Sequence, residues 1–236
     1  MESKRLERYT LLDGQDTSVV KSTILYISSN VQNPNFEAKI MDNLIKNAKN
    51  KPIVWVTQEP LNKPGVNICV GRHASSYFNE FRQIEIGLNA IETPYVTMAE
   101  ADCLYPPEYF IFDPPELGHR YLYENSWIQD LYPRRDSKFR YKGVSDFAQV
   151  VDRKLWLEHL RQYLPKDPEW SDENSLPYLQ LHHFPDPTFT GRPAISFKTE
   201  GSLSKKTPLK HNVPRRTSLE LWGSALKLKE KMLSSL

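Results

Sequence analysis

The sequence predicts an α/β fold in which a mostly parallel, twisted sheet is flanked by helices and followed by a loop-rich C-terminal half. Short, continuous apolar runs of strand length alternate with stretches in which apolar residues recur every three or four positions. Strand and helix patterns that alternate in this way are typical of β–α–β units, which build parallel sheets. After residue 100 the alternation gives way to proline-rich and aromatic-rich sequence, which indicates loops or short antiparallel strands.

The strands of the predicted sheet are continuous apolar runs. Runs without polar alternation are typical of strands that are buried on both faces. They predict strands at Thr23–Ser28, Pro52–Thr57, Val66–Gly71, Tyr95–Met98 and Asp146–Val151. Apolar residues at helical spacing predict helices at Phe36–Lys49, with Asn35 as the N-cap, and at Ser75–Ala90.

The C-terminal half contains fewer regular elements. A helix is predicted at Asp152–Tyr163, where the first residue can cap the first turn. Residues 164–216 are expected to be irregular. A last helix is predicted at Thr217–Ser235, because Thr217 and Glu220 have the spacing of a capping box.

The length of 236 residues predicts one domain, which we divide into three segments. Residues 1–21 form a polar lead-in, and residues 22–183 form the main α/β unit. Residues 184–236 carry a basic loop and a C-terminal helix, which are expected to pack on the same domain.

Composition and charge are those of an ordinary globular protein. The net charge of +2 and the pI near 8.4 are too mild to indicate a partner. The first residues lack the apolar core of a signal peptide, and no run approaches the roughly 18 apolar residues of a membrane span. The two cysteines form no disulfide framework, which fits a reducing compartment. We therefore expect a cytoplasmic protein without a membrane span.

The pattern with the clearest chemical meaning ends the fourth apolar run. Glu100 and Asp102 stand one residue apart at its end, and an aromatic–proline turn follows them. The C-terminal edge of parallel strands is where open α/β sheets bind ligands. Mg²⁺ and similar cations take oxygen ligands from one or two carboxylates and from substrate phosphates. The pattern favours a metal site for a phosphorylated donor, and the alternative is a merely acidic start to the following turn.

The order of these features resembles the glycosyltransferases of the GT-A fold, near their family 2 group. The resemblance rests on the strand Ile24–Asn30, the helix end Arg82–Ala90, the motif Glu100–Asp102, the segment Gly143–Arg153 and the acidic stretch Trp170–Glu173. The family usually has Asp at the first position of its Asp-x-Asp motif, whereas this chain has Glu. The resemblance covers residues 22–183, which it identifies as a GT-A-like catalytic domain.

The resemblance implies a metal-dependent enzyme that moves a sugar from a nucleotide sugar, with a UDP-sugar as the expected donor. The metal is Mn²⁺ or Mg²⁺, and its expected ligands are Glu100, Asp102 and His211. The expected donor-site residues are Ser28, Asn30, Arg82 and Lys210. Among these, Asn30 would bond the base or ribose, and the planar guanidinium of Arg82 would bind a phosphate.

An attacking hydroxyl needs a carboxylate that takes its proton. Asp172 and Glu173 are the expected bases, because they resemble the family's second acidic pair, and Asp146 is a rival. Acids in a polar loop are also commonly just solvated, so that alternative stays open. The basic segment Lys198–Arg216 is expected to be a lid over the donor diphosphate or a contact for acceptor phosphates, and an ordinary solvated loop is its alternative.

The expected reaction is a single displacement with inversion on a soluble acceptor. The acceptor can be a saccharide, a protein or a hydroxymethylated base in DNA, as in phage DNA-modifying glycosyltransferases. Two other functions stay open. A nucleotidyltransferase would use a similar sheet, although the turn after Ile27 lacks the usual glycine-rich phosphate loop. A non-catalytic nucleic-acid-binding protein would use the basic segment, although the net charge is nearly neutral.

Overall fold

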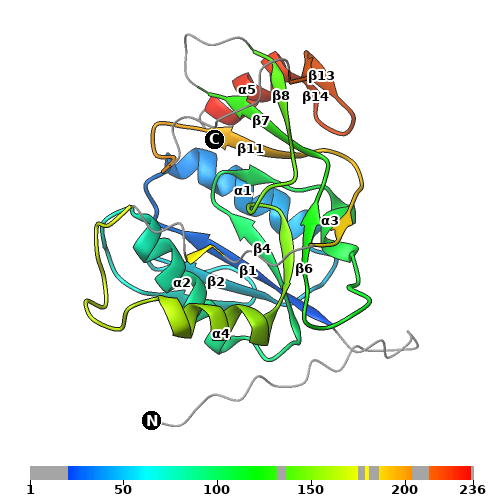
Figure 1. Ribbon diagram of the computed structural model, residues 1–236. Coiled ribbons are helices and arrows are strands. Elements are labelled where there is room, and N and C mark those ends of the chain that lie inside the picture. The colour runs from blue at the N-terminus through cyan, green and yellow to red at the C-terminus, as the bar shows by residue number, and fades with distance from the viewer. Residues whose placement is uncertain (1–20, 132–136, 175–178, 181–185, 204–212, 235–236) are drawn as a thin grey trace.

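The computed structural model describes residues 21–131, 137–174, 179–180, 186–203 and 213–234, which form a mixed α/β structure. Figure 1 shows a larger sheet in the lower part of the view, a smaller sheet above it and helix α1 (Pro34–Asn47) between them. Helices α2 (Tyr77–Ala90) and α4 (Arg153–Tyr163) cover the opposite face of the larger sheet. The structure therefore confirms the predicted α/β class, with a multi-stranded sheet flanked by helices.

The larger sheet has seven strands in the order β10–β6–β9–β4–β1–β2–β3. Four of its six neighbouring pairs are parallel, and β9 runs antiparallel to β4 and β6. The strands are β1 Ser22–Ser28, β2 Ile53–Thr57, β3 Val66–Cys69, β4 Tyr95–Glu100, β6 Arg120–Tyr123, β9 Gln149–Asp152 and β10 Thr188–Phe189. The sheet is mostly parallel, as predicted, and the C-terminal ends of β1, β2 and β4 meet at one edge.

The smaller sheet has five strands in the order β12–β8–β7–β11–β5. These strands are β5 Cys103–Leu104, β7 Ser126–Asp130, β8 Phe139–Gly143, β11 Ala194–Lys198 and β12 Arg215–Arg216. A hairpin of β13 (Ser218–Leu219) and β14 (Gly223–Ser224) precedes the last helix. The backbone N–H of Phe197 in β11 donates to the carbonyl of Asp102, 2.8 Å away, so the turn after β4 is tied to the smaller sheet.

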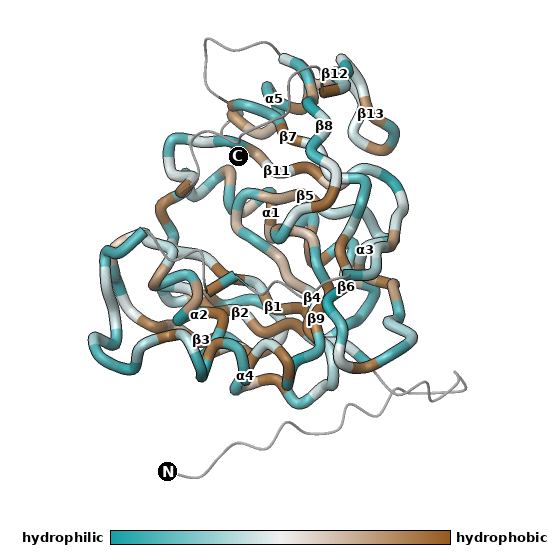
Figure 2. Tube along the Cα trace, in the orientation of Figure 1, coloured by the Kyte–Doolittle hydropathy of each residue, from teal (hydrophilic) through white to brown (hydrophobic). Residues whose placement is uncertain are grey.

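Both faces of β1 are buried, which explains its continuous apolar run. Ile24 and Tyr26 pack in the core that α1 and the smaller sheet share. Leu25 and Ile27 pack on the opposite side, with α2 and α4. Figure 2 shows the hydrophobic stretch where β1 runs through the interior. The strand ends at Ser28, where the chain reaches the edge of the sheet.

The helix ends follow local hydrogen bonding. Asn33, rather than the predicted Asn35, caps α1, because its side chain accepts from the backbone N–H groups of Asn35 and Phe36. Asp152 caps α4, as predicted. The remaining helices are α3 (Pro107–Ile111) and α5 (Ala225–Leu233). None of the helices within the described ranges is long and apolar enough to cross a membrane.

Two predictions for the C-terminal half are wrong. The last helix begins at Ala225 rather than Thr217, because Leu221 and Gly223 have φ angles of 72° and 68°, which an α-helix does not allow. The segment 164–216 was expected to be irregular, but it contains the buried strand β11, whose partners are distant in sequence. A five-residue run of mixed polarity carries little local signal for such a strand.

Candidate active site

A cavity of about 840 Å³ lies at the C-terminal edge of the larger sheet. Its walls come from the turn after β1, the end of β4, the first turn of α2, the loop between β8 and β9, and the segment after β11. The cavity is therefore lined by elements of both sheets and lies where parallel α/β sheets bind ligands. Its volume is within the roughly 300–1,000 Å³ of small-molecule sites.

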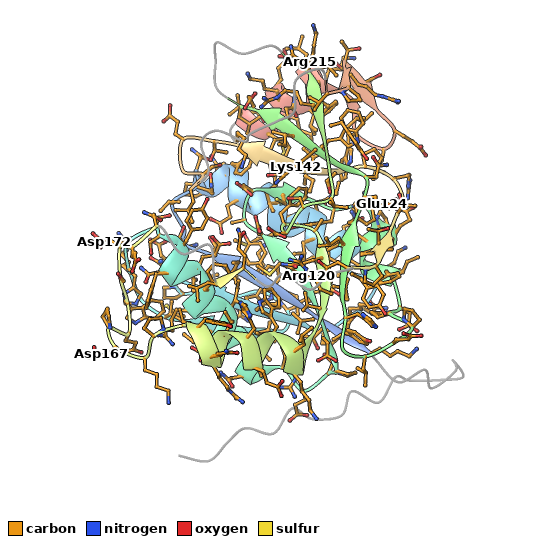
Figure 3. All side chains as sticks on the ribbon, viewed as in Figure 1. Arg120, Glu124, Lys142, Asp167, Asp172 and Arg215 are labelled. Atoms are coloured by element: carbon orange, nitrogen blue, oxygen red, sulfur yellow. The ribbon has the colours of Figure 1, made fainter. Side chains whose placement is uncertain are left out.

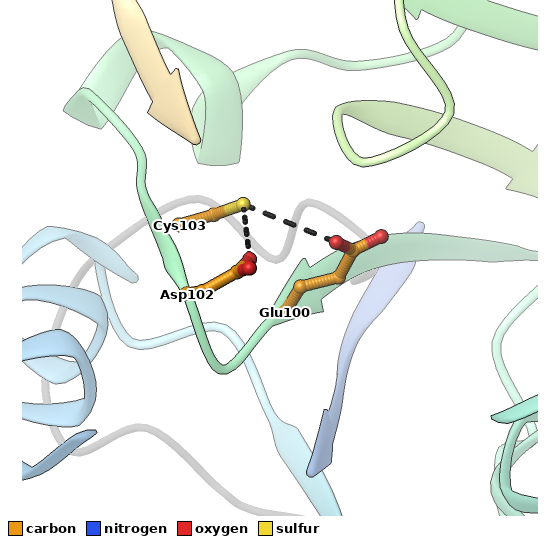
Figure 4. Close-up of side chains that lie close together, drawn as sticks. All are labelled: Glu100, Asp102 and Cys103. Carbon is orange, nitrogen blue, oxygen red and sulfur yellow. Dashed lines mark hydrogen bonds between the residues drawn. The ribbon is translucent and has the colours of Figure 1, made fainter. Parts of the chain in front are cut away.

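The predicted acidic pair lies in this cavity. Glu100 is the last residue of β4, and Asp102 belongs to the turn that leads into β5. Figure 4 shows both carboxylates beside the thiol of Cys103, and one ligand atom from each residue lies within 4.8 Å of the others. The structure thus brings together the two carboxylates that the sequence predicted as metal ligands.

Hydrogen bonds orient the carboxylate of Asp102. The Cys103 thiol donates to Oδ1 at 3.2 Å, and the Ser202 hydroxyl donates to Oδ2 at 3.1 Å. Burial, followed by the charges of Asp102 and Glu100, raises the pKa of Cys103 well above its usual value. The thiol is therefore a hydrogen-bond donor at neutral pH, and the carboxylates are the groups that offer ligand oxygens.

Glu80 in α2 is a third carboxylate in the cavity, and the sequence analysis missed it. Burial, helped by Asp102 and Asp146, raises the pKa of Glu80 to about 7. The signal was available, because Glu80 stands four residues before Ile84 and so shares the inward face of the helix. A charged residue on that face is unusual unless it serves a site.

The acidic groups fit a divalent cation. Burial raises the pKa of Glu100 well above its usual value, and the charges of Glu80 and Asp102 add to the effect. Carboxylates that repel one another in this way are stabilised by a bound cation. An all-oxygen donor set suits Mg²⁺ or Mn²⁺. Glu100 and Asp102 are the residues that would hold the ion, with Glu80 nearby.

Two lysines line the same cavity, and the charges of both act on Glu100. Lys142 lies in β8, and Lys198 is the last residue of β11. Burial and the neighbouring charge of Lys198 lower the pKa of Lys142. Figure 3 labels Lys142 near the middle of the molecule, in the upper half of the view. The ammonium groups of Lys142 and Lys198 would attract an anionic ligand such as a diphosphate.

Of the predicted donor-site residues Ser28 and Asn30, only Ser28 lines the cavity. Ser28 lines the cavity, and its hydroxyl accepts from the backbone N–H of Asn30 at 2.9 Å. The Asn30 side chain does not line the cavity, since its Oδ1 accepts from the backbone N–H groups of Gln58 and Glu59, at 2.8 and 2.9 Å. Asn30 therefore braces the turns after β1 and β2 and does not reach the ligand space.

Gln58 is a further cavity residue that the sequence analysis missed. It lines the cavity, and its Oε1 accepts from the backbone N–H of His73 at 2.8 Å. Its buried Nε2 has no hydrogen-bond partner among the described residues. The hydrogen bond from His73 to Gln58 fixes the turn after β2, where that turn borders the cavity.

The prediction that Arg82 binds a phosphate is not supported by its position. Its guanidinium lies outside the cavity and is buried against the loop after α4, where it donates to the carbonyls of Glu169 and Pro165. It also forms an ion pair with Glu85 at 2.5 Å. Because its guanidinium N–H groups donate to these partners, Arg82 connects α2 to the loop after α4. Lys210 and His211 lie outside the described residues.

The three predicted bases also lie in different places relative to the cavity. Asp172 and Glu173 are exposed and do not line the cavity, and Figure 3 shows Asp172 at the outer edge of the molecule, away from Lys142. Asp146 does line the cavity. Its Oδ1 lies 3.2 Å from Nη1 of Arg120, and its side chain is 49% exposed. Of the three predicted bases, only Asp146 is placed near the acidic pair.

No protein-family model matches the sequence, and no curated protein matches it. Several solved structures are similar in shape. TarS of S. aureus, solved in complex with UDP-GlcNAc, is 11% identical, with a TM-score of 0.46 over 79% of this chain. The glycosyltransferase GlyE of Streptococcus pneumoniae is 12% identical, with a TM-score of 0.41 over 72%. A cytidylyltransferase of Thermus thermophilus, which acts on 2-C-methyl-D-erythritol 4-phosphate, is 11% identical, with a TM-score of 0.40 over 72%.

The similar structures thus include glycosyltransferases and a nucleotidyltransferase. The chain spans 61% of the TarS chain, 44% of the GlyE chain and 88% of the cytidylyltransferase, and about half of two further matched chains. At these TM-scores the similarity concerns the general arrangement of helices and strands and not the activity.

Proposed function

We propose that this protein is a metal-dependent glycosyltransferase that moves a sugar from a UDP-sugar to an acceptor hydroxyl, with inversion. The observation that carries the proposal is the pair Glu100 and Asp102 at the end of a central parallel strand, inside a large cavity. Lys142 and Lys198, which line the same cavity near Glu100, complement the phosphates of such a donor. Ser28 and Gln58, which line the cavity at the ends of β1 and β2, support binding of the nucleoside there.

Each part of the cavity has a role in this reaction. Glu100 and Asp102 would hold Mn²⁺ or Mg²⁺, which supplies positive charge to the departing diphosphate. The lysines contribute further positive charge where the negative charge grows. The turns after β1 and β2 would hold the nucleoside. The diphosphate would then lie near Glu100 and Asp102, and the sugar would follow the diphosphate.

The chemical step is a substitution at the anomeric carbon. The acceptor oxygen forms a bond to that carbon, while the bond from the carbon to the phosphate oxygen breaks and the nucleoside diphosphate leaves. The proton of the acceptor hydroxyl passes to a carboxylate. Asp146 and Glu80 are the two cavity carboxylates outside the metal pair, and either can accept it. Asp172 and Glu173 are no longer our first candidates.

The acceptor is a soluble molecule with a reactive hydroxyl, and a hydroxymethylated base in DNA is one such acceptor. Arg215 and Arg216 support a polyanionic acceptor, since they are exposed on β12 and β12 pairs with β8, which continues to Lys142 in the cavity. A transfer assay with hydroxymethylated and unmodified DNA tests this acceptor. A cytoplasmic location fits the free Cys69 and Cys103.

The first experiment is thermal unfolding of the protein with UDP, GDP or CDP, each with and without Mn²⁺. A ligand at about 100 times its dissociation constant stabilises the folded state by roughly 2.7 kcal/mol. We expect a rise in the melting temperature with UDP that requires Mn²⁺. No rise with any nucleotide would contradict the proposal. Release of UDP during turnover, without pyrophosphate, then separates sugar transfer from nucleotidyl transfer.

A further inference from the structure

The chain that leaves β11 holds Asp102 at two points. The backbone N–H of Phe197 donates to the carbonyl of Asp102 at 2.8 Å, and the hydroxyl of Ser202 donates to its Oδ2 at 3.1 Å. Ser202 is only 6% exposed, and it lines the cavity together with Asp102. Both the backbone and the carboxylate of this expected metal ligand are therefore positioned by residues about 100 positions further along the chain.

The hydrogen bonds around Ser202 decide where its hydroxyl hydrogen points. Its Oγ accepts from the backbone N–H of Thr199 at 3.0 Å, so its own hydrogen is directed elsewhere. Three acceptors lie near it: Oδ2 of Asp102 at 3.1 Å, Oγ1 of Thr199 at 3.2 Å and the carbonyl of Phe197 at 3.4 Å. The carboxylate is the nearest and carries the charge, and hydrogen bonds to ionised acceptors are roughly twice as strong as neutral ones. Ser202 therefore donates to Asp102.

The turn Thr199–Ser202 rests on the turn after β1. The hydroxyl of Thr199 donates to Oε1 of Gln32 at 2.7 Å, and Gln32 lines the cavity. Gly201 packs closely on the same turn, because a Cβ added to it would lie 3.1 Å from the carbonyl oxygen of Val31. These contacts leave the turn little room to shift, so the hydroxyl that holds the carboxylate is itself held in place.

The two acidic residues differ in how firmly they are oriented. Each carboxylate oxygen of Asp102 accepts one hydrogen bond, from Cys103 at Oδ1 and from Ser202 at Oδ2. A carboxylate oxygen has about two lone-pair sites, so each oxygen keeps one for a cation. The Glu100 carboxylate is less constrained, since the Cys103 thiol lies 4.0 Å from its Oε2 (Figure 4). Asp102 is therefore the preoriented member of the pair.

We propose that Ser202 is a positioning residue of the metal site, which holds the Asp102 carboxylate in the orientation that binds the cation. The inference rests on the proposed function, in which Glu100 and Asp102 bind Mn²⁺ or Mg²⁺. A carboxylate that must first be ordered binds a cation more weakly, because the ordering costs free energy. Loss of a hydrogen-bond partner behind a metal ligand typically lowers metal affinity about 10- to 100-fold.

The test measures the Mn²⁺ affinity of the full-length protein by electron paramagnetic resonance, with and without UDP. Ser202→Ala removes the hydroxyl and should weaken Mn²⁺ binding about 10- to 100-fold. Its affinity for UDP at saturating Mn²⁺ should stay unchanged, because the bound cation already orients Asp102. Ser145→Ala is the matched control and should bind Mn²⁺ as the wild type does. Ser145 lines the same cavity, but among the described residues only Cys103 and Ser202 donate to the Asp102 carboxylate.

A second variant decides the matter if Ser202→Ala does not fold. Thr199→Val keeps the shape of the side chain and the Ser202 hydroxyl but removes the hydrogen bond to Gln32. It should weaken Mn²⁺ binding severalfold, because the turn is no longer anchored. Unchanged Mn²⁺ affinity in the folded Ser202→Ala protein, or in Thr199→Val where Ser202→Ala does not fold, overturns the inference and leaves the proposed function standing.

Two further outcomes separate the inference from its alternatives. An equal loss of Mn²⁺ affinity and of UDP affinity at saturating Mn²⁺ in Ser202→Ala would show damage to the whole cavity, which contradicts a positioning role at Asp102. If the wild type binds no Mn²⁺ even with UDP, the proposed function is wrong and the inference falls with it.

Discussion

Two acidic pairs look alike in the sequence and differ in the structure. Glu100 and Asp102 end a buried parallel strand and lie in a cavity with Glu80 and two lysines. Asp172 and Glu173 lie in an exposed loop outside that cavity. The comparison teaches that acids at the C-terminal edge of a sheet are forced together and desolvated, whereas acids in a loop remain solvated. Place in the fold therefore distinguishes a site from an acidic surface.

The strongest contrast between the two pairs is expected in catalysis. Asp102→Asn should reduce sugar transfer at least about 100-fold, because the diphosphate loses a charge partner worth several kcal/mol. Asp172→Asn, its matched control, should change the rate by no more than about twofold. The rates are measured as UDP release at saturating donor and Mn²⁺. A similar loss in both variants would remove the distinction.

A second contrast concerns the proton acceptor. Glu80→Gln and Asp146→Asn are made one at a time, with Glu173→Gln as the control from the loop. The variant that lacks the base should lose about 10²–10⁴-fold in kcat, because general base catalysis is worth that much. Its affinity for UDP should change little. Full activity in both cavity variants would return the base to the loop pair.

A third contrast appears in stability without metal. Glu100→Gln should raise the melting temperature at pH 8 by about 2–4 °C, because it removes a desolvated charge near other carboxylates. Glu173→Gln removes an exposed charge and should leave the melting temperature unchanged. Differential scanning calorimetry in the presence of a chelator makes the comparison. With Mn²⁺ and UDP the order should reverse, because the wild type gains a ligand that Glu100→Gln binds poorly.

The last contrast is a pH dependence that belongs to the cavity acids. The raised pKa of Glu80, about 7, means that the folded protein binds more protons than the unfolded chain between the ordinary carboxyl pKa and pH 7. Stability from Glu80 is thus greatest at low pH and falls as the pH rises through about 7. The melting temperature of the wild type, relative to Glu80→Gln, should drop from about pH 5 to about pH 8. A constant difference would show that Glu80 titrates normally.

The parts of the fold that were predicted from sequence are those with strong local signals. The apolar run of β1 and the capping residue Asp152 were read correctly because burial on both faces and a capped first turn are local properties. β11 and the hairpin before α5 were missed because pairing with distant strands and positive φ angles decide them.

The same difference explains the outcome for the candidate site. The position of Glu100 and Asp102 at the sheet edge was predicted because the strand that delivers them is recognisable by itself, and their role as metal ligands stays a prediction. Gln58 was missed because its place in the cavity depends on which elements fold over the sheet, whereas Glu80 was overlooked although its position on the inward face of α2 was a local signal. The contacts of Arg82 were not predicted, because the sequence shows that it is on a helix but not that it faces the loop after α4.

The central claim is that Glu100 and Asp102 form a metal site for a nucleotide diphosphate. The most direct test is Mn²⁺ electron paramagnetic resonance, in which bound Mn²⁺ loses the sharp signal of the free ion. We predict that the wild type with UDP removes this signal, that Asp172→Asn behaves as the wild type does, and that Asp102→Asn leaves the signal free. Equal Mn²⁺ binding by Asp102→Asn and the wild type would contradict the claim.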